Sequence, residues 1–115
     1  MPEPSSAPNA SWAAYLHAMQ GDSAMHDGDL DAAYTCYEAS LAAFDRAGDV
    51  LGRSIPLRAL AAMAILQADY RAAHELFEES LAGLYQAPRS ASLERSVNLS
   101  LQGLALVAAH EKTQF

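Results

Sequence analysis

Apolar residues recur along the chain at steps of three and four, the spacing that places side chains on one face of an α-helix. The pattern is clearest after Asp29 and again after Asp69, where each aspartate can cap the helix that follows it. Gly48 is suited to end the first of these helices, and the second must stop before Pro88. The apolar positions of the two predicted helices are Leu30, Ala33, Tyr37, Leu41 and Phe44, and Tyr70, Ala73, Phe77, Leu81 and Leu84.

Three further helices are predicted around these two. The first begins near Ser11, a good N-cap residue, and ends near Asp27-Gly28. The third occupies roughly residues 50–67, and the fifth runs from about Ser92 to His110. The pattern therefore predicts five helices and no strands.

Pro56 complicates the start of the third helix. Proline is tolerated in the first turn of a helix, where its missing N–H would be unpaired anyway. We therefore favour a helix that begins at about Ser54, with one looser turn before it. The alternative is a helix that starts near Val50 and bends at Pro56.

Composition supports the helical prediction and bounds the domain organisation. Ala and Leu are strong helix formers, and hydrophobic residues make up 51% of the 115 residues. A chain of this length suits one domain of modest core, which we place at residues 11–110. Residues 1–10, rich in Pro, Ser and Ala, are expected to form a disordered N-terminal tail, and residues 111–115 a short C-terminal tail.

The charge balance excludes some partners. The formal net charge is −7, from 14 acidic and 7 basic residues, and Lys112 is the single lysine. Phosphate-binding surfaces need clustered cations, so we expect no direct binding to nucleic acid or to an anionic membrane surface. Cys36 is the single cysteine, which favours a reducing compartment, and no secretory signal or membrane span is recognisable. A soluble, cytoplasmic protein is expected.

Residues 69–84 repeat the pattern of residues 29–44 at a distance of 40 residues. Asp, Ala, Ala, Glu, Ser, Leu and Ala recur at identical offsets, and Tyr37 corresponds to Phe77. A fixed period of this size indicates stacked helical hairpins, none of which can bury its apolar face alone. The paired alanines would let neighbouring helices approach closely, and the two aromatic residues would fill the space between hairpins.

The strongest matches between the copies are Gly28-Asp29-Leu30-Asp31-x-Ala33-x-x-x-Tyr37 and Ala68-Asp69-Tyr70-Arg71-x-Ala73-x-x-x-Phe77. These stretches resemble the tetratricopeptide repeat superfamily, although its usual period is about 34 residues. The longer period is similar to that of repeats in the sensor regions of bacterial transcription activators of the maltose-regulator type. The resemblance implies antiparallel hairpins stacked as a short right-handed solenoid of about two and a half repeats. Gln20 and Gln102, where the pattern usually has Leu, and Pro56 depart from it.

By this resemblance, the protein is a non-catalytic scaffold or adaptor that binds a partner peptide or helix. The alternative is a regulatory domain that senses a small ligand or peptide in the concave groove and controls a partner protein. The first helices of such hairpins line the groove. The residues expected there are Tyr15, Asp22, Met25, His26, Arg58, Ala62 and Ile65.

The fifth predicted helix carries more apolar residues than one buried side can accommodate. An apolar patch left uncovered usually marks an interface, so we expect homodimerisation through this helix. The competing explanations are that the chain is a fragment or that a separate partner covers the patch. The residues expected at the interface are Leu93, Val97, Leu101, Leu104 and Val107.

No constellation of catalytic or metal-binding residues is apparent. Asp22 and His26 share a helix face, but this pair is more often a surface ion pair than half of a metal site. Glu75, Glu78 and Glu79 cluster away from the apolar stripe, as on a solvated face. We expect no cofactor, no metal and no enzymatic activity.

Overall fold

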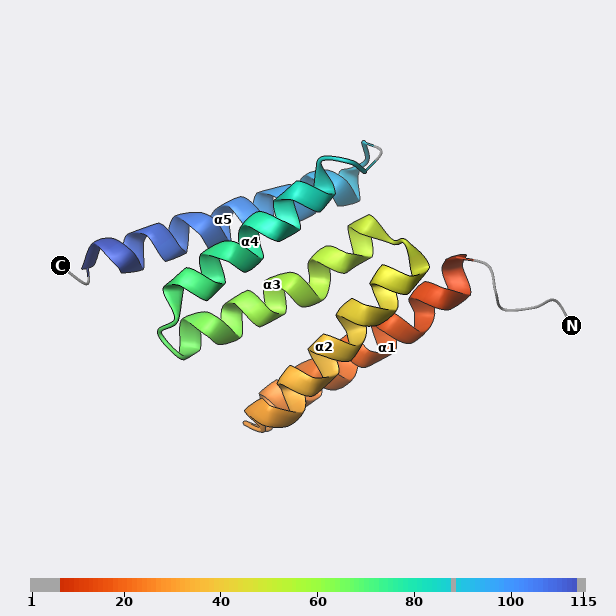
Figure 1. Ribbon diagram of the computed structural model, residues 1–115, viewed down its shortest axis with the longest axis horizontal. Coiled ribbons are helices and arrows are strands. Elements are labelled where there is room, and N and C mark those ends of the chain that lie inside the picture. Colours follow the sequence, from red (N-terminus) through yellow and green to blue (C-terminus); the bar gives the residue numbers. More distant parts are fainter. Residues whose placement is uncertain (1–6, 88, 114–115) are drawn as a thin grey trace, which may run out of the picture.

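The computed structural model describes residues 7–87 and 89–113, and this part of the chain folds into five α-helices without a strand (Figure 1). The all-α prediction is confirmed. No helix in the described part is long and apolar enough to cross a membrane. The helices are α1 (Ala7–His26), α2 (Leu30–Ala47), α3 (Val50–Leu66), α4 (Tyr70–Leu84) and α5 (Ala91–Thr113).

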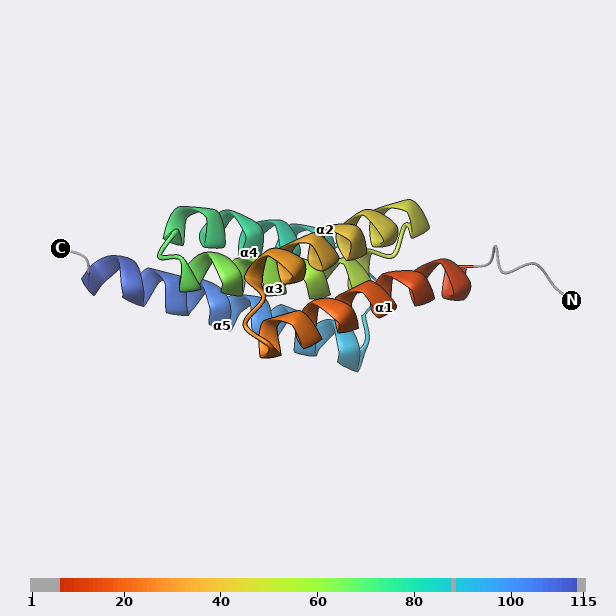
Figure 2. The ribbon, with the colours of Figure 1, turned by 90° about the horizontal axis from the view of Figure 1, so that it is seen from below.

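The helices form a repeating series of hairpins. Helix α1 packs against α2, α3 packs against α2 and α4, and α5 packs against α4. Figure 2 shows α2 and α4 along one side of the molecule and α1 and α5 toward the other, with α3 between. Because α3 also contacts both α1 and α5, the odd-numbered helices form one continuous layer.

The first three connections between helices share one geometry and recur every 20 residues. Each contains one residue with a left-handed backbone, at positions 28, 48 and 68, with φ of 80°, 68° and 62°. An aspartate follows, and its carboxylate accepts a hydrogen bond from the backbone N–H three residues further on, which caps the next helix. These caps join Asp29 to Ala32 (3.1 Å), Asp49 to Gly52 (2.8 Å) and Asp69 to Ala72 (3.2 Å).

The two sequence copies bury equivalent residues. Ala33 and Ala73 are fully buried, and Tyr37 and Phe77 are nearly so. Each ring packs where a neighbouring helix has a glycine: a Cβ at Gly21 would lie 2.7 Å from the ring of Tyr37. Phe77 packs in the same way against Gly103 of α5, where an added Cβ would lie 2.3 Å from the ring. The predicted role of these alanines and aromatic residues in close helix packing is therefore confirmed.

The predicted start of the first helix at Ser11 is wrong. Helix α1 begins at Ala7, so residues 7–10 of the expected tail are helical, while residues 1–6 lie outside the described residues. Ser11 is buried inside the helix, and its hydroxyl donates a hydrogen bond to the Asp49 carboxylate at 2.7 Å. A polar residue that looked like a local cap thus serves a contact between distant parts of the chain.

The favoured start of the third helix at Ser54 is also wrong. Helix α3 begins at Val50, as in the alternative, because the Asp49 cap fixes its start. Pro56 lies well inside the helix and is fully buried, so its packing offsets the hydrogen bond that it cannot donate. Tertiary packing here overrides the local preference for proline in a first turn.

The fifth helix is slightly longer than predicted. It begins at Ala91 rather than Ser92, because the Ser90 hydroxyl accepts a hydrogen bond from the N–H of Leu93 at 3.0 Å. It continues to Thr113, so residues 111–113 of the expected C-terminal tail are helical. Residues 114–115 lie outside the described residues.

The left-handed backbone of Ala68 gives a test of the connection geometry. Non-glycine residues pay a steric cost in this conformation, whereas the equivalent positions 28 and 48 are glycines. We expect Ala68→Gly to raise the free energy of unfolding by about 0.5–1 kcal/mol, measured by urea denaturation. The matched control is Gly48→Ala, which should lower it by a similar amount through the cost of the left-handed backbone alone, since an added Cβ there meets no atom within 4 Å. A neutral or destabilising Ala68→Gly would contradict the assigned geometry.

Candidate functional site

The layer of α1, α3 and α5 exposes large apolar side chains at repeat-equivalent positions. Leu66 and Leu106 lie one 40-residue period apart and are 66% and 47% exposed. Met19 and Leu99 lie two periods apart and are 64% and 42% exposed. Equivalent positions on equivalent helices face the same way, and Leu99 and Leu106 lie seven residues apart on one side of α5, so we assign these four side chains to one face. We call this face, with the residues between them, the α1–α3–α5 surface.

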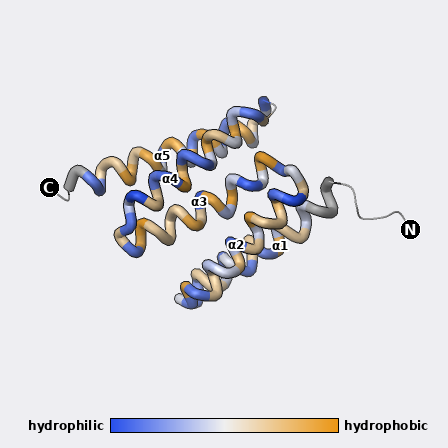
Figure 3. Tube along the Cα trace, viewed as in Figure 1, coloured by the Kyte–Doolittle hydropathy of each residue, from blue (hydrophilic) through white to orange (hydrophobic). Residues whose placement is uncertain are grey.

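Figure 3 places hydrophobic stretches along both α3 and α5. On α3, Ile55, Arg58, Ala62 and Leu66 are spaced by three and four residues and therefore share one side of the helix. Ala62 and Leu66 are exposed, which identifies this side as the one facing solvent.

The seven residues predicted to line the groove do not all reach this surface. Tyr15, Asp22, His26 and Ala62 are exposed. Met25 and Ile65 are half-buried and pack mainly on the cores of the hairpins. Arg58, the seventh, is half-buried.

Sequence reasoning did not single out Met19 and Leu99 for this surface. The signal was present, because the 40-residue period places positions 19, 59 and 99 in register.

Two of the exposed residues on α1 have side-chain partners within the fold. The ring of Tyr15 packs edge-on against Phe44, with the centroids 5.0 Å apart and the planes at 87°. The Asp22 carboxylate accepts a hydrogen bond from the hydroxyl of Tyr37. Burial, together with this hydrogen bond and charge, raises the pKa of Tyr37 far above its usual value, so the phenol stays protonated. Asp22 is thus held against α2.

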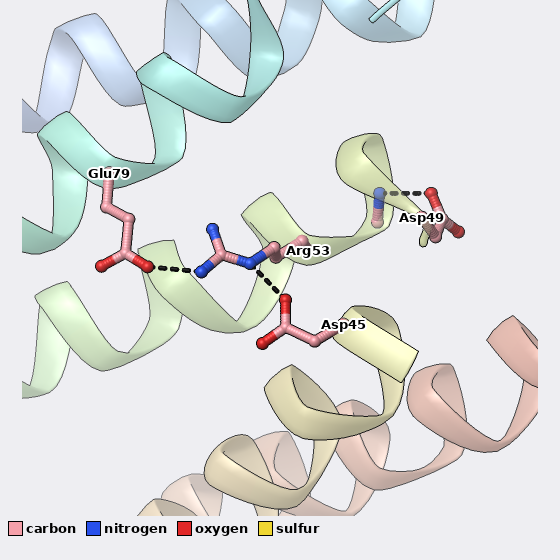
Figure 4. Close-up of polar contacts among 5 residues, drawn as sticks. Asp45, Asp49, Arg53 and Glu79 are labelled. Atoms are coloured by element: carbon pink, nitrogen blue, oxygen red, sulfur yellow. Dashed lines mark hydrogen bonds and ion pairs between the residues drawn. The ribbon is translucent and has the colours of Figure 1, made fainter. Parts of the chain in front are cut away.

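Arg53 links three helices through two ion pairs (Figure 4). From α3, its Nε donates to Asp45 of α2 and its Nη2 donates to Glu79 of α4, both at 2.5 Å. Burial lowers the pKa of Arg53, but the two hydrogen bonds and carboxylate charges outweigh it, so the pKa is raised overall. This residue, which sequence reasoning did not single out, ties the second half of α2 to the second hairpin.

Arg58, one and a half turns further along α3, has a very different environment. Its Nη1 donates to the hydroxyl of Ser54 at 3.0 Å, and that hydroxyl donates to the carbonyl of Leu51 at 2.7 Å. Burial alone lowers the pKa of Arg58, with no compensating carboxylate among the described residues. By its position on α3, Arg58 lies beside Ala62 at the edge of the α1–α3–α5 surface and is half-buried, and Ser54 is the partner of its guanidinium among the described residues.

The residues predicted for self-association on α5 are divided between the core and the surface. Leu93 and Val107 are buried, and Leu104 packs against the core that includes Ala61 and Phe77. Val97 is half-buried, and Leu101 is exposed.

The prediction is therefore wrong for Leu93 and Val107, whose side chains are covered within the chain itself. They share a face of α5 with Ser100. This face packs on α4, and the hydroxyl of Ser100 is hydrogen-bonded to the hydroxyl of Ser80 on α4 at 2.9 Å.

A cavity of about 420 Å³ lies where the end of α4 meets the first half of α5. Its apolar wall includes Leu84, Leu93 and Val97, and Tyr85 stands beside it with 72% of its surface exposed. Polar side chains at its edge are Arg89, Glu94 and Asn98. A second cavity, of about 260 Å³, lies among α2, α3 and α4, away from the α1–α3–α5 surface.

The described part of the chain offers no cluster of three or more His, Cys, Asp or Glu side chains that could hold a metal ion. His74 lies 3.5 Å from Glu78 one turn away on α4, as expected for a pair on a solvated helix face. Cys36 is a free, half-buried thiol.

Stacked helical hairpins with an apolar face on one layer define a helical-repeat protein. A family model of the tetratricopeptide repeat matches residues 13–86, which is more than half of the chain, so the chain belongs to the tetratricopeptide repeat family. The match spans α1 to α4, and α5 lies beyond it. No curated protein and no solved structure matches the chain significantly.

Proposed function

We propose that this protein is a non-catalytic interaction module that docks an amphipathic helix or peptide of a partner protein on the α1–α3–α5 surface. The observation that carries the proposal is the repeat-equivalent exposure of Leu66 with Leu106 and of Met19 with Leu99. Large exposed apolar side chains gathered on one face usually mark a surface that contacts another protein. Helical-repeat proteins commonly use such extended surfaces for protein–protein interaction, which agrees with the family of this chain.

A second candidate function is that of a sensor domain, as in the maltose-regulator-type activators that the 40-residue period resembles. The cavity of about 420 Å³ supports it, because it combines an apolar wall with the charged side chains of Arg89 and Glu94. Its volume is within the range of small-molecule sites. A metabolite that raises the melting temperature of the protein would favour this function. If the same metabolite no longer raised the melting temperature of Val97→Trp, the ligand would be placed in the cavity.

We further propose that α5 pairs with α5 of a second copy. On α3, Leu57, Ala61 and Ala64 are buried. Ala61 and Ala64 share a core with Ala73 and Phe77 of α4, so α4 covers this side of α3. The residues 40 positions later are Val97, Leu101 and Leu104 on α5. The described part has no sixth helix to cover them: Leu101 is 46% exposed, whereas Val97 is half-buried and Leu104 packs in part on the core of α3 and α4. An antiparallel α5 pair would let each helix replace the missing second helix of the other hairpin.

The remaining proposals concern organisation and location. We propose one domain, predicted at residues 11–110 and extended by the helix ends at Ala7 and Thr113. We also propose a cytoplasmic location, which the free thiol of Cys36 supports. The acidic net charge of −7 supports partners other than nucleic acids or anionic membranes.

Binders selected from a displayed library of amphipathic helices test the interaction surface. We expect Leu66→Ser to weaken the selected binders by roughly tenfold or more, because a buried leucine contact contributes about 1.5–3 kcal/mol. The matched control is Tyr34→Ser on α2, which removes a side chain of comparable exposure from a different layer. The measurement is the dissociation constant by fluorescence anisotropy. Binders that lose affinity with Tyr34→Ser but not with Leu66→Ser would refute the proposed surface.

Light scattering over a range of concentrations tests self-association. We expect twice the chain mass for the wild-type protein and the single-chain mass for Leu101→Glu, since a carboxylate at the centre of the helix pair would be desolvated. Leu30→Glu, an exposed leucine on α2, is the control and should leave the mass unchanged. A wild-type protein with the mass of one chain at every concentration would contradict the proposed dimer.

A further inference from the structure

Arg58 and Arg53 lie on the same helix but differ in how their charges are compensated. Arg53 binds two carboxylates, from Asp45 and Glu79. Arg58 is also partly removed from water, yet the hydrogen bond described for its guanidinium goes to the neutral hydroxyl of Ser54. Of the 14 acidic residues in the chain, none that the structure describes forms an ion pair with it.

This arrangement has an energetic cost in the free protein. A guanidinium that is partly desolvated loses hydration, and only a carboxylate or several hydrogen bonds can replace it. Ser54 supplies only a neutral acceptor, a hydroxyl that itself donates to the carbonyl of Leu51 at 2.7 Å, so it does not replace a carboxylate. A ligand that brings a carboxylate to Arg58 would therefore recover interaction energy that the fold leaves unused.

The position of Arg58 indicates which part of a ligand would meet it. Arg58 belongs to the central helix of the α1–α3–α5 surface, on the side that carries the exposed Ala62 and Leu66. Exposed apolar side chains lie on both flanking helices, Met19 on α1 and Leu99 and Leu106 on α5. A helix that contacts both flanks must place its middle, rather than its end, over α3.

The repeat register sets Arg58 apart from its equivalents. The position 40 residues earlier is Ala18, which is buried, and the position 40 residues later is Asn98, which is exposed and uncharged. The cation is thus a feature of the central repeat and is not required by the stacking of hairpins. Its half-burial beside apolar side chains suits recognition of one charge within an otherwise apolar contact.

We propose that Arg58 is the specificity-determining residue of this surface, and that it pairs with an Asp or Glu side chain in the central turn of a partner's amphipathic helix. This inference rests on the proposed function of the α1–α3–α5 surface. The apolar side chains of the partner helix contact Met19, Leu66 and Leu106, and its acidic side chain replaces the water lost by the guanidinium.

The test uses the full chain and the displayed library of amphipathic helices. Selected helices are expected to carry Asp or Glu in their central turn. Replacing that residue by its amide, or changing Arg58→Gln, should each weaken binding by roughly tenfold or more, as expected for a charge-assisted hydrogen bond. The two changes together should cost little more than either alone, since both remove the same pair.

Two control variants separate recognition from folding. Arg71→Gln makes the same charge change on α4, where the side chain of Arg71 is 91% exposed, and should leave binding unchanged. Arg58→Lys keeps the charge but not the forked geometry of the guanidinium, and should recover part of the affinity. Circular dichroism melting checks that each variant is folded.

The outcomes distinguish this inference from the proposed function. Binders that are lost with Leu66→Ser but keep full affinity for Arg58→Gln would refute the role of Arg58 and leave the surface standing. Binders that place the carboxylate at their C-terminus would overturn the proposed central acidic side chain. A library that yields no helix dependent on Leu66 would overturn both.

Discussion

The architecture depends on one short connection, a left-handed residue followed by a capping aspartate. It reverses the chain, ends one helix and starts the next, and it occurs at positions 28–29, 48–49 and 68–69. Because the interval is constant, α2 and α3, which lie between these connections, have similar lengths of 18 and 17 residues. Successive helices alternate between two layers. Odd-numbered helices therefore present equivalent sides in the same direction, and this makes a repeated surface possible.

The same regularity decides which faces remain open. Ala33 and Ala73 allow close helix contact, and Tyr37 and Phe77 fill the space between helices against Gly21 and Gly103. These contacts use the sides of α1, α3 and α5 that point into the molecule. The opposite sides keep Met19, Leu66, Leu99 and Leu106 exposed. In a protein whose core is otherwise satisfied, these side chains and the undercompensated charge of Arg58 are the features best explained by a partner.

Much of the fold could be predicted because its determinants are local. The caps Asp29 and Asp69, the stop at Gly48 and the apolar steps of three and four are readable without a structure. The errors arose where distant contacts decide. Ser11 looks like a cap, but its hydroxyl binds Asp49, and Pro56 is held inside α3 by burial.

The candidate site was less predictable for the same reason. Leu93 and Val107 read as surplus apolar residues, yet they lie on the face of α5 that packs against α4. The unequal environments of Arg53 and Arg58 also depend on which carboxylates the fold brings near. No local pattern indicates that Asp45 and Glu79 converge on Arg53, whereas Arg58 has no carboxylate partner among the described residues.

The measurement that tests this account most directly is the free energy of unfolding of Asp29→Ala, Asp49→Ala and Asp69→Ala. Each loss should be about 1 kcal/mol, as for removal of a helix cap, and Asp49→Ala should cost the most because it also frees the hydroxyl of Ser11. Asp27→Ala, an exposed aspartate in the first connection that caps no helix, should change stability by less than about 0.5 kcal/mol. If the three cap variants were no less stable than Asp27→Ala, the repeated connection would not be the constraint that organises this fold.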